Sequence, residues 1–154
     1  MRAVVAIIFV AAVAAGTGCG PRFHHPTPKG FVELPAERSY DYRAISADGL
    51  VLAARRLDHE PRGELAFWTR AIGNHLRHTG GYALLESRDV KTAGGMSGVQ
   101  LRFGHDESKH PHLYYVTVFV TDAAIYLLEA GGTRELMEAG AEQVEWAVHN
   151  FRID

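Results

Sequence analysis

The feature that most constrains the fold is a series of apolar, β-branched segments in the second half of the chain, separated only by short turns. "VQLRFG" at 99–104 alternates apolar and polar side chains, and "LYYVTVFVT" at 113–121 is rich in β-branched and aromatic residues. Asp122-Ala123 then leads into "AIYLLEAGG" at 124–132. Such residues favour strands, and connections this short join antiparallel neighbours. The sequence therefore predicts an antiparallel sheet.

The first half adds further strands of the same kind. Residues 40–46 and 50–57 flank an Asp48-Gly49 turn, where glycine tolerates positive φ. Residues 82–90, "YALLESRDV", follow a Gly80-Gly81 pair and predict a third strand. Strands are therefore predicted both before and after residues 63–81.

Two segments have helical periodicity. Within 63–81, Leu65, Trp68, Ile72 and Leu76 fall on one face of a 3.6-residue repeat. A second helix is expected to begin near Thr133, with its stripe given by Leu136, Gly140, Val144 and Phe151. Trp68 and Trp146 are both expected in the core.

The expected fold class is α+β, with the element order β-β-α-β-β-β-β-α. We predict a single-domain sandwich in which a mostly antiparallel sheet of about six strands is covered by two amphipathic helices, because each helix has one apolar stripe to bury. Hydrophobic residues make up 47% of the chain, which is enough for a core. The net charge of −2 argues against a nucleic-acid partner.

The N-terminus has the pattern of an export signal. Arg2 precedes an apolar run at 3–15, which is shorter than the roughly twenty residues of a membrane span. Ala12-Val13-Ala14 fits ordinary signal cleavage, whereas Gly16-Thr17-Gly18-Cys19 resembles a bacterial lipobox, in which the cysteine sulfur takes a diacylglycerol. Cys19 is the only cysteine, and a free thiol would be reactive in an oxidising compartment. Lipid attachment at Cys19 is therefore favoured.

These patterns predict three regions. Residues 1–18 are the signal peptide, 19–30 the lipidated N-terminus with a flexible tether, and 31–154 the folded domain. The tether is inferred from "GPRFHHPTPKG" at 20–30, which contains three Pro and two Gly. The expected location is the bacterial cell envelope. Since Gly20 is not the acidic residue that retains enteric lipoproteins in the inner membrane, the outer membrane is favoured if the source has one.

A resemblance to a known family extends this interpretation. "SADGLVLAARRL" at 46–57 and "GELAFW" at 63–68, followed by a strand-rich half and a C-terminal helix, resemble the PsbP-like domains of small bacterial lipoproteins, including DcrB-like ones. The resemblance implies a sandwich around an antiparallel sheet and a non-catalytic accessory or binding role. It implies no catalytic residue and no cofactor. The expected partners are the membrane, through the N-terminal lipid, and an unknown envelope protein.

The alternative function is a metal- or small-ligand-binding envelope protein. "HDESKHPH" at 105–112 contains His105, His110 and His112, which are residue types that Zn²⁺ takes as ligands. Pro111 and the flexible loop favour a solvated hairpin over a metal site. The Arg55-Arg56 pair lies at the end of a predicted strand, where one side chain should face outward. Partner binding is a second interpretation of this pair. No G-x-S-x-G motif supports nucleophilic catalysis.

Overall fold

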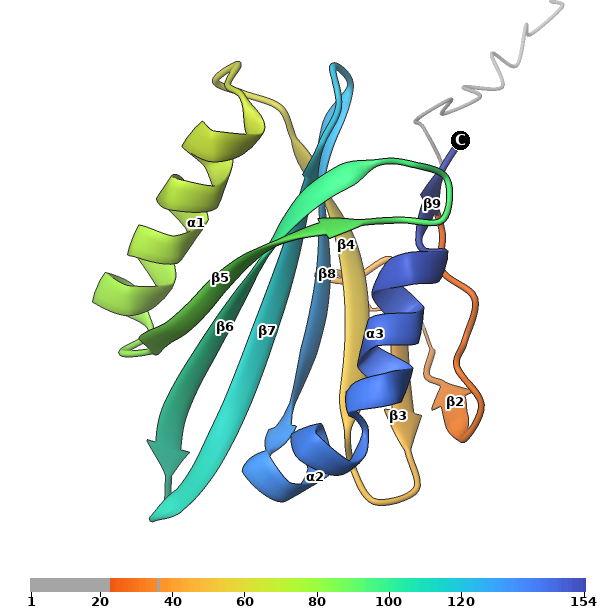
Figure 1. The fold of residues 1–154 in the computed structure, drawn as a ribbon, viewed down its shortest axis with the longest axis vertical. Helices are drawn as coiled ribbons and strands as arrows, with labels where there is room; N and C mark the ends of the chain where they lie inside the picture. The colour runs from red at the N-terminus through yellow and green to blue at the C-terminus, as the bar shows by residue number, and fades with distance from the viewer. Residues whose placement is uncertain (1–22, 36) are drawn as a thin grey trace, which may run out of the picture.

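A seven-stranded antiparallel sheet forms the centre of the protein (Figure 1). The computed structural model describes residues 23–35 and 37–154. Every neighbouring pair in the sheet is antiparallel. In spatial order the strands are β2 (Phe31–Glu33), β3 (Tyr42–Ser46), β4 (Val51–Asp58), β8 (Ala124–Thr133), β7 (His110–Val120), β6 (Ser97–Glu107) and β5 (Ala83–Lys91).

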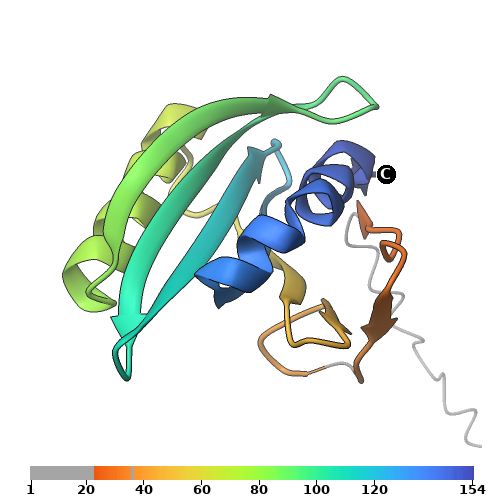
Figure 2. The same cartoon turned by 60° about the horizontal axis from the view of Figure 1, so that its bottom comes forward.

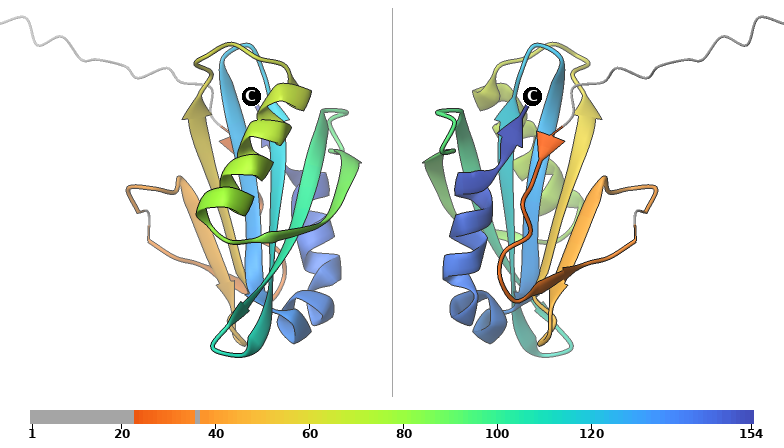
Figure 3. Two further views of the ribbon diagram at one scale, coloured as in Figure 1. Left: turned by 90° about the vertical axis from the view of Figure 1, so that its left-hand side faces the viewer. Right: turned by 90° about the vertical axis from the view of Figure 1, so that its right-hand side faces the viewer.

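Helices cover both faces of this sheet. Helix α1 (Leu65–Thr79) lies on one face, and α2 (Arg134–Ala139) and α3 (Ala141–Asn150) lie on the other, as Figures 2 and 3 show. The alternation of side chains along each strand divides the core into two clusters. Beneath α1 are Leu101, Phe103, Val116, Val118, Ile125 and Leu127. The predicted α+β class is therefore confirmed, with seven strands in the main sheet where about six were expected.

Helix α1 follows its predicted stripe. Leu65, Trp68, Ile72 and Leu76 all pack against the cluster beneath α1. Gly73 is the buried residue of the helix, and a Cβ there would lie 3.4 Å from Leu101 Cδ1. This is an ordinary van der Waals contact, so the buried position has room for a methyl group.

The second predicted helix is divided into α2 and α3. Thr133 caps α2, since its hydroxyl accepts a hydrogen bond from the Leu136 backbone N–H at 3.3 Å. Gly140 ends α2 and begins α3. A Cβ at Gly140 would collide with the Leu50 side chain, so the absence of a side chain allows the bend. The apolar stripe alone did not reveal this break.

The folded domain extends further toward the N-terminus than expected. Strand β1 (Phe23–His24) pairs antiparallel with β9 (Arg152–Ile153), although 23–30 was predicted to be a flexible tether. Phe23 contacts Tyr126 and Phe151, with ring centroids 5.8 and 5.4 Å apart. Phe23 and His24 are therefore part of the folded domain and not of the predicted tether. The predicted signal peptide, lipobox and Cys19 lie outside the described residues.

Helix length bears on how the described part could meet a membrane. Within 23–35 and 37–154, none of the helices combines the length and apolar character that crossing a bilayer requires.

Candidate functional site

The His-rich segment forms the end of the β6–β7 hairpin. His105 is opposite His112 in the ladder, and their rings stack with centroids 5.7 Å apart. Ser108 and Lys109 form the turn with positive φ, as a two-residue hairpin requires. His110 pairs with Glu107. In the described part of the chain no three His, Cys, Asp or Glu side chains are close enough to share a metal ion. The hairpin thus brings His105 and His112 together without assembling a three-ligand group.

An ion pair between a half-buried arginine and a buried carboxylate lies on the sheet face that carries α1. Glu129 in β8 is only 3% exposed. Its neighbours Leu128 and Ala130 belong to the core cluster on the other face of the sheet, beneath α3, so Glu129 points to the α1 face. Its Oε1 accepts hydrogen bonds from Arg55 Nη2 at 2.9 Å and from Tyr114 Oη at 2.6 Å. Adjacent strands β4 and β7 flank β8 and supply these two donors. The sheet order therefore surrounds the carboxylate with a cation and a hydroxyl.

This cluster retains unused hydrogen-bonding groups. Glu129 Oε2 and Arg55 Nε are buried, and neither has a partner among the described residues. A cavity of about 130 Å³ lies here, lined by Tyr40, Arg43, Val51, Ala53, Tyr114, Glu129, Ala130 and Gly131. Glu129 lines the cavity and its Oε2 accepts hydrogen bonds, so the cavity can hold a group that donates one, such as a hydroxyl or a water molecule.

Burial controls the protonation of the tyrosines at this cavity. Desolvation raises the pKa of Tyr114 well above its usual range, and the nearby Glu129 carboxylate raises it further. Burial likewise raises the pKa of Tyr40. Both phenols therefore remain protonated at neutral pH, so Tyr114 acts as a hydrogen-bond donor to Glu129.

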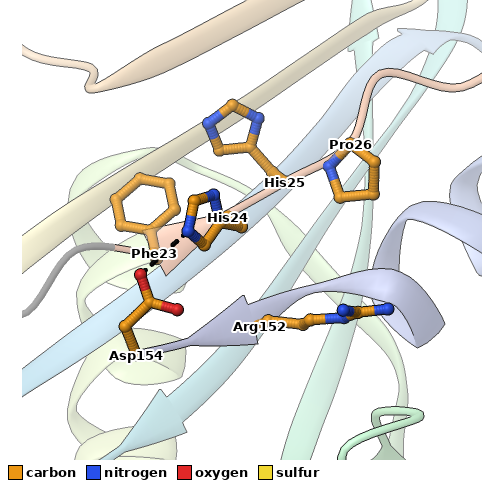
Figure 4. Close-up of a pocket in the computed structure, with 6 residues that line it drawn as sticks. All are labelled: Phe23, His24, His25, Pro26, Arg152 and Asp154. Atoms are coloured by element: carbon orange, nitrogen blue, oxygen red, sulfur yellow. Dashed lines mark ion pairs between the residues drawn. The ribbon is translucent and has the colours of Figure 1, made fainter.

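A second cavity, of about 610 Å³, lies at the β1–β9 pair (Figure 4). It is lined by Phe23, His24, His25, Pro26, Arg152 and Asp154. His24 Nε2 and Asp154 Oδ2 are 2.8 Å apart. The His25 ring packs on Tyr42 with centroids 3.4 Å apart, and burial lowers the pKa of His25 to about 4. His25 is therefore neutral at physiological pH.

Helix α3 presents an exposed aromatic side chain between two grooves. Trp146 is 42% exposed, which contradicts its predicted place in the core. One groove, of about 630 Å³, lies between α3 and residues 27–30. The other, of about 480 Å³, lies between α3 and the end of β5. We call Trp146 and these two grooves the α3 surface.

Sequence reasoning identified only part of these sites. It singled out Arg55 as a candidate contact residue, and the structure places Arg55 against Glu129. Glu129 itself was missed, although an acidic residue inside the apolar strand "AIYLLEAGG" was an available signal. His24 and His25 were assigned to the tether, because pairing with residues 152–153 leaves no local pattern.

Comparison with known proteins identifies the fold. No protein-family model and no curated protein sequence matches the chain. Among solved structures, LpqN of Mycobacterium tuberculosis, described as involved in cell envelope biogenesis, has a TM-score of 0.68 at 15% identity, covering 90% of this chain and 87% of LpqN. A Pseudomonas aeruginosa protein of unknown function, described as a putative regulator, has a TM-score of 0.55 at 12% identity, with 87% and 84% covered.

The predicted resemblance to PsbP-like domains agrees with a further structure. Cyanobacterial PsbP from Synechocystis sp. PCC 6803 has a TM-score of 0.53 at 10% identity, covering 90% of this chain and 96% of that one. The chain therefore has a PsbP-like fold.

Proposed function

We propose that this chain is a lipid-anchored protein of the bacterial cell envelope that acts without catalysis, by contact with a partner protein. Cys19 would carry the lipid, in the outer membrane if the source has one. The envelope role of LpqN and the accessory role implied by the PsbP-like resemblance support this proposal.

The observation that carries the contact function is the α3 surface. Exposed tryptophan is uncommon on a protein surface and is enriched where partners bind, because a large rigid ring loses little entropy on burial. Trp146 stands between grooves that present both polar and apolar side chains. A partner helix or loop can therefore surround the ring.

The anchor is tested by mass spectrometry of the mature N-terminus together with a Cys19→Ala variant. A lipid-modified Cys19, and loss of membrane association in the variant, are the expected results. Separation of inner and outer membranes then locates the wild-type protein. An unmodified thiol at position 19 of the mature protein would contradict the anchor.

The contact surface is tested by crosslinking in intact cells, with the full chain carrying a photoreactive residue at Gln143 in place of the glutamine. We expect one protein adduct that disappears in Trp146→Ala. Phe67→Ala is the matched control, because Phe67 is 49% exposed and lies on α1, on the opposite face. Equal adduct yields in the two variants would exclude Trp146 as the contact residue.

A small-ligand function is the second candidate, and the unpaired Oε2 of Glu129 favours it. We place this alternative at the cavity beside Glu129 rather than at the His-rich hairpin, because the unpaired carboxylate oxygen lies there. Native mass spectrometry of the protein purified from its host membrane should then show a bound small molecule. Ala53→Leu, which fills the cavity, should release the ligand, whereas Ala66→Leu on the exposed face of α1 should retain it. A ligand-free wild-type protein would exclude this function.

A further inference from the structure

The point where the chain enters the folded domain is fixed. Phe23 is paired with Ile153 and packs against Phe151, so the first described residue is held by the β1–β9 pair. Only residues 20–22 separate Phe23 from Cys19. An extended chain gains at most about 3.6 Å per residue, so Phe23 lies within about 14 Å of a lipidated Cys19. This end of the domain would therefore adjoin the headgroups.

The same end of the domain presents one arginine, Arg152, beside one carboxylate, Asp154, which lies 2.8 Å from His24 Nε2. Arg152 lines the 610 Å³ cavity, and no carboxylate in the described part of the chain lies within ion-pair distance of it. The backbone N–H of Ala93 donates to the carbonyl of His149 at 2.6 Å, which holds the β5–β6 turn near β9 (Figure 1). Lys91, also without a described ion-pair partner, precedes that turn.

Among the described residues that line the cavity, Arg152 is the one with a permanent positive charge. His24 lies against Asp154, and His25 is held neutral by burial. Figure 4 shows the Arg152 side chain extending away from Asp154 and running below Pro26. A guanidinium offers a planar fork of donors that matches two oxygens of a phosphate.

We propose that the cavity between β1 and β9 faces the membrane and that Arg152 there binds the phosphate of an anionic phospholipid headgroup. This inference rests on the proposed anchor at Cys19. It assigns the domain one orientation, with the Ser108–Lys109 turn at the end remote from the membrane, opposite β9 (Figure 1). The grooves of α3 then run along the side of the molecule, where a partner in the same membrane reaches them.

The test uses the full chain in intact cells, with a photoreactive residue at position 26 or at position 109. Pro26 lines the cavity, and Lys109 lies in the remote turn. Irradiation should give phospholipid adducts, identified by mass, at position 26 in about tenfold excess over position 109. Equal yields at the two positions, or no lipid adduct at position 26, would overturn the proposed orientation.

Arg152→Gln separates specific phosphate binding from mere proximity. It should lower the adduct at position 26 about threefold or more, since the phosphate loses its charged partner. Arg70→Gln is the matched control, because Arg70 is an exposed arginine on α1 and the same charge is removed. An equal yield in Arg152→Gln and Arg70→Gln would contradict the role of Arg152.

Two further measurements complete the test. The first distinguishes a missing headgroup contact from a missing anchor, and the second distinguishes a lipid phosphate from a soluble phosphate. The mass of the Cys19 peptide is recorded in the same samples. A lipidated Cys19 without adducts at position 26 refutes this inference and leaves the anchor intact, whereas an unmodified Cys19 refutes the anchor. Inorganic phosphate added to the purified full chain should leave its Tm unchanged. An Arg152-dependent rise in Tm without lipid adducts would assign the cavity to soluble phosphate instead.

Discussion

At the scale of single residues, Glu129 is the position where the sheet departs most from an apolar interior. A buried carboxylate is costly unless a cation and hydrogen-bond donors surround it, and Arg55 and Tyr114 supply both. Such pairs contribute little net stability compared with apolar residues of similar size. The presence of the Glu129 pair is therefore weak evidence that it stabilises the fold.

Breaking this pair from one side should be strongly destabilising. Arg55→Met leaves the carboxylate buried without its cation, and we expect a loss of about 3 kcal/mol in the free energy of unfolding. Tyr114→Phe removes one hydrogen bond to a charged group and should cost about 1.5 to 3 kcal/mol. Urea unfolding at neutral pH measures both.

The matched control removes both charges together. The double variant Arg55→Met, Glu129→Leu should be more stable than Arg55→Met alone, because no charge is then left unpaired and only the neutral Tyr114 hydroxyl loses its acceptor. A double variant as unstable as Arg55→Met alone would show that the loss comes from packing of the arginine stem.

His25 should make stability depend on pH. Burial lowers its pKa from 6.5 to about 4 in the folded protein, so the unfolded chain binds the proton more tightly. Above pH 6.5 the residue contributes no pH dependence. As pH falls from 6.5 to 4, stability decreases, and below pH 4 the loss levels off. After allowance for partial exposure we expect a loss of about 2 kcal/mol.

The contribution of His25 is obtained by difference. His25→Phe keeps an aromatic ring against Tyr42 and removes the titrating group, so the fall in stability between pH 6.5 and 4 should be smaller than in the wild type. His78→Phe on the exposed face of α1 is the matched control for replacing a histidine with phenylalanine. Identical profiles for all three proteins would refute the role of His25.

At the scale of secondary-structure elements, the close approach of β6 to the core depends on Gly98. A Cβ there would lie 2.6 Å from the Phe119 ring and 2.7 Å from the Val118 carbonyl oxygen. Phe119 stacks on Phe151, with ring centroids 5.2 Å apart, at the C-terminal cap of α3. A side chain at position 98 would therefore disturb the layer between β6 and α3.

Gly98→Ala should thus destabilise the protein by about 1 to 3 kcal/mol through overpacking. Gly94→Ala is the matched control, since a Cβ there would meet only Thr92 Oγ1, at 3.8 Å, and its φ is not positive. Thermal or urea unfolding of the two variants gives the comparison. Equal stability of the variants would mean that the Phe119 ring and the Val118 carbonyl both move aside at no cost.

The elements with strong local patterns were predictable from the sequence. Strands β7 and β8 and helix α1 lie where β-branched runs and the 3.6-residue stripe predicted them. The short strands β1, β2 and β9 were not predicted, because two or three residues carry no periodicity. Their pairing is long-range, as the contact of Phe23 with Ile153 shows.

Trp146 shows a second limit of pattern-based prediction. It follows Val144 by two positions, so it lies off the face of α3 that buries Val144 and Val148. We predicted Trp146 on the apolar stripe of this helix, whereas the geometry of α3 turns its side chain away from the sheet. The candidate site could not be predicted for a different reason. Arg55, Tyr114 and Glu129 are far apart in the sequence, and only the order of β4, β8 and β7 brings them together.

At the scale of the whole molecule, the proposed orientation follows from a short connection between two fixed points. One is the proposed lipid at Cys19, and the other is Phe23 in the β1–β9 pair. Because the connection is short, the cavity with Arg152 stays near the headgroups and meets them at high effective concentration. In the proposed orientation, the length of the connection would therefore control phosphate binding as directly as the residues of the cavity do.

Lengthening the connection should weaken lipid contact without releasing the protein. An insert of about twenty Gly and Ser residues between Gly20 and Pro21 adds an average span of roughly 25 Å. We expect the protein to remain in the membrane fraction, while phospholipid adducts at position 26 fall about fivefold, because the effective concentration of headgroups at the cavity drops. An insert of the same length between Asp48 and Gly49, in the β3–β4 turn, is the control and should leave the adducts unchanged. Unchanged adducts with the first insert would show that the cavity finds the membrane by its own affinity, and the short connection would then have no part in orienting the domain.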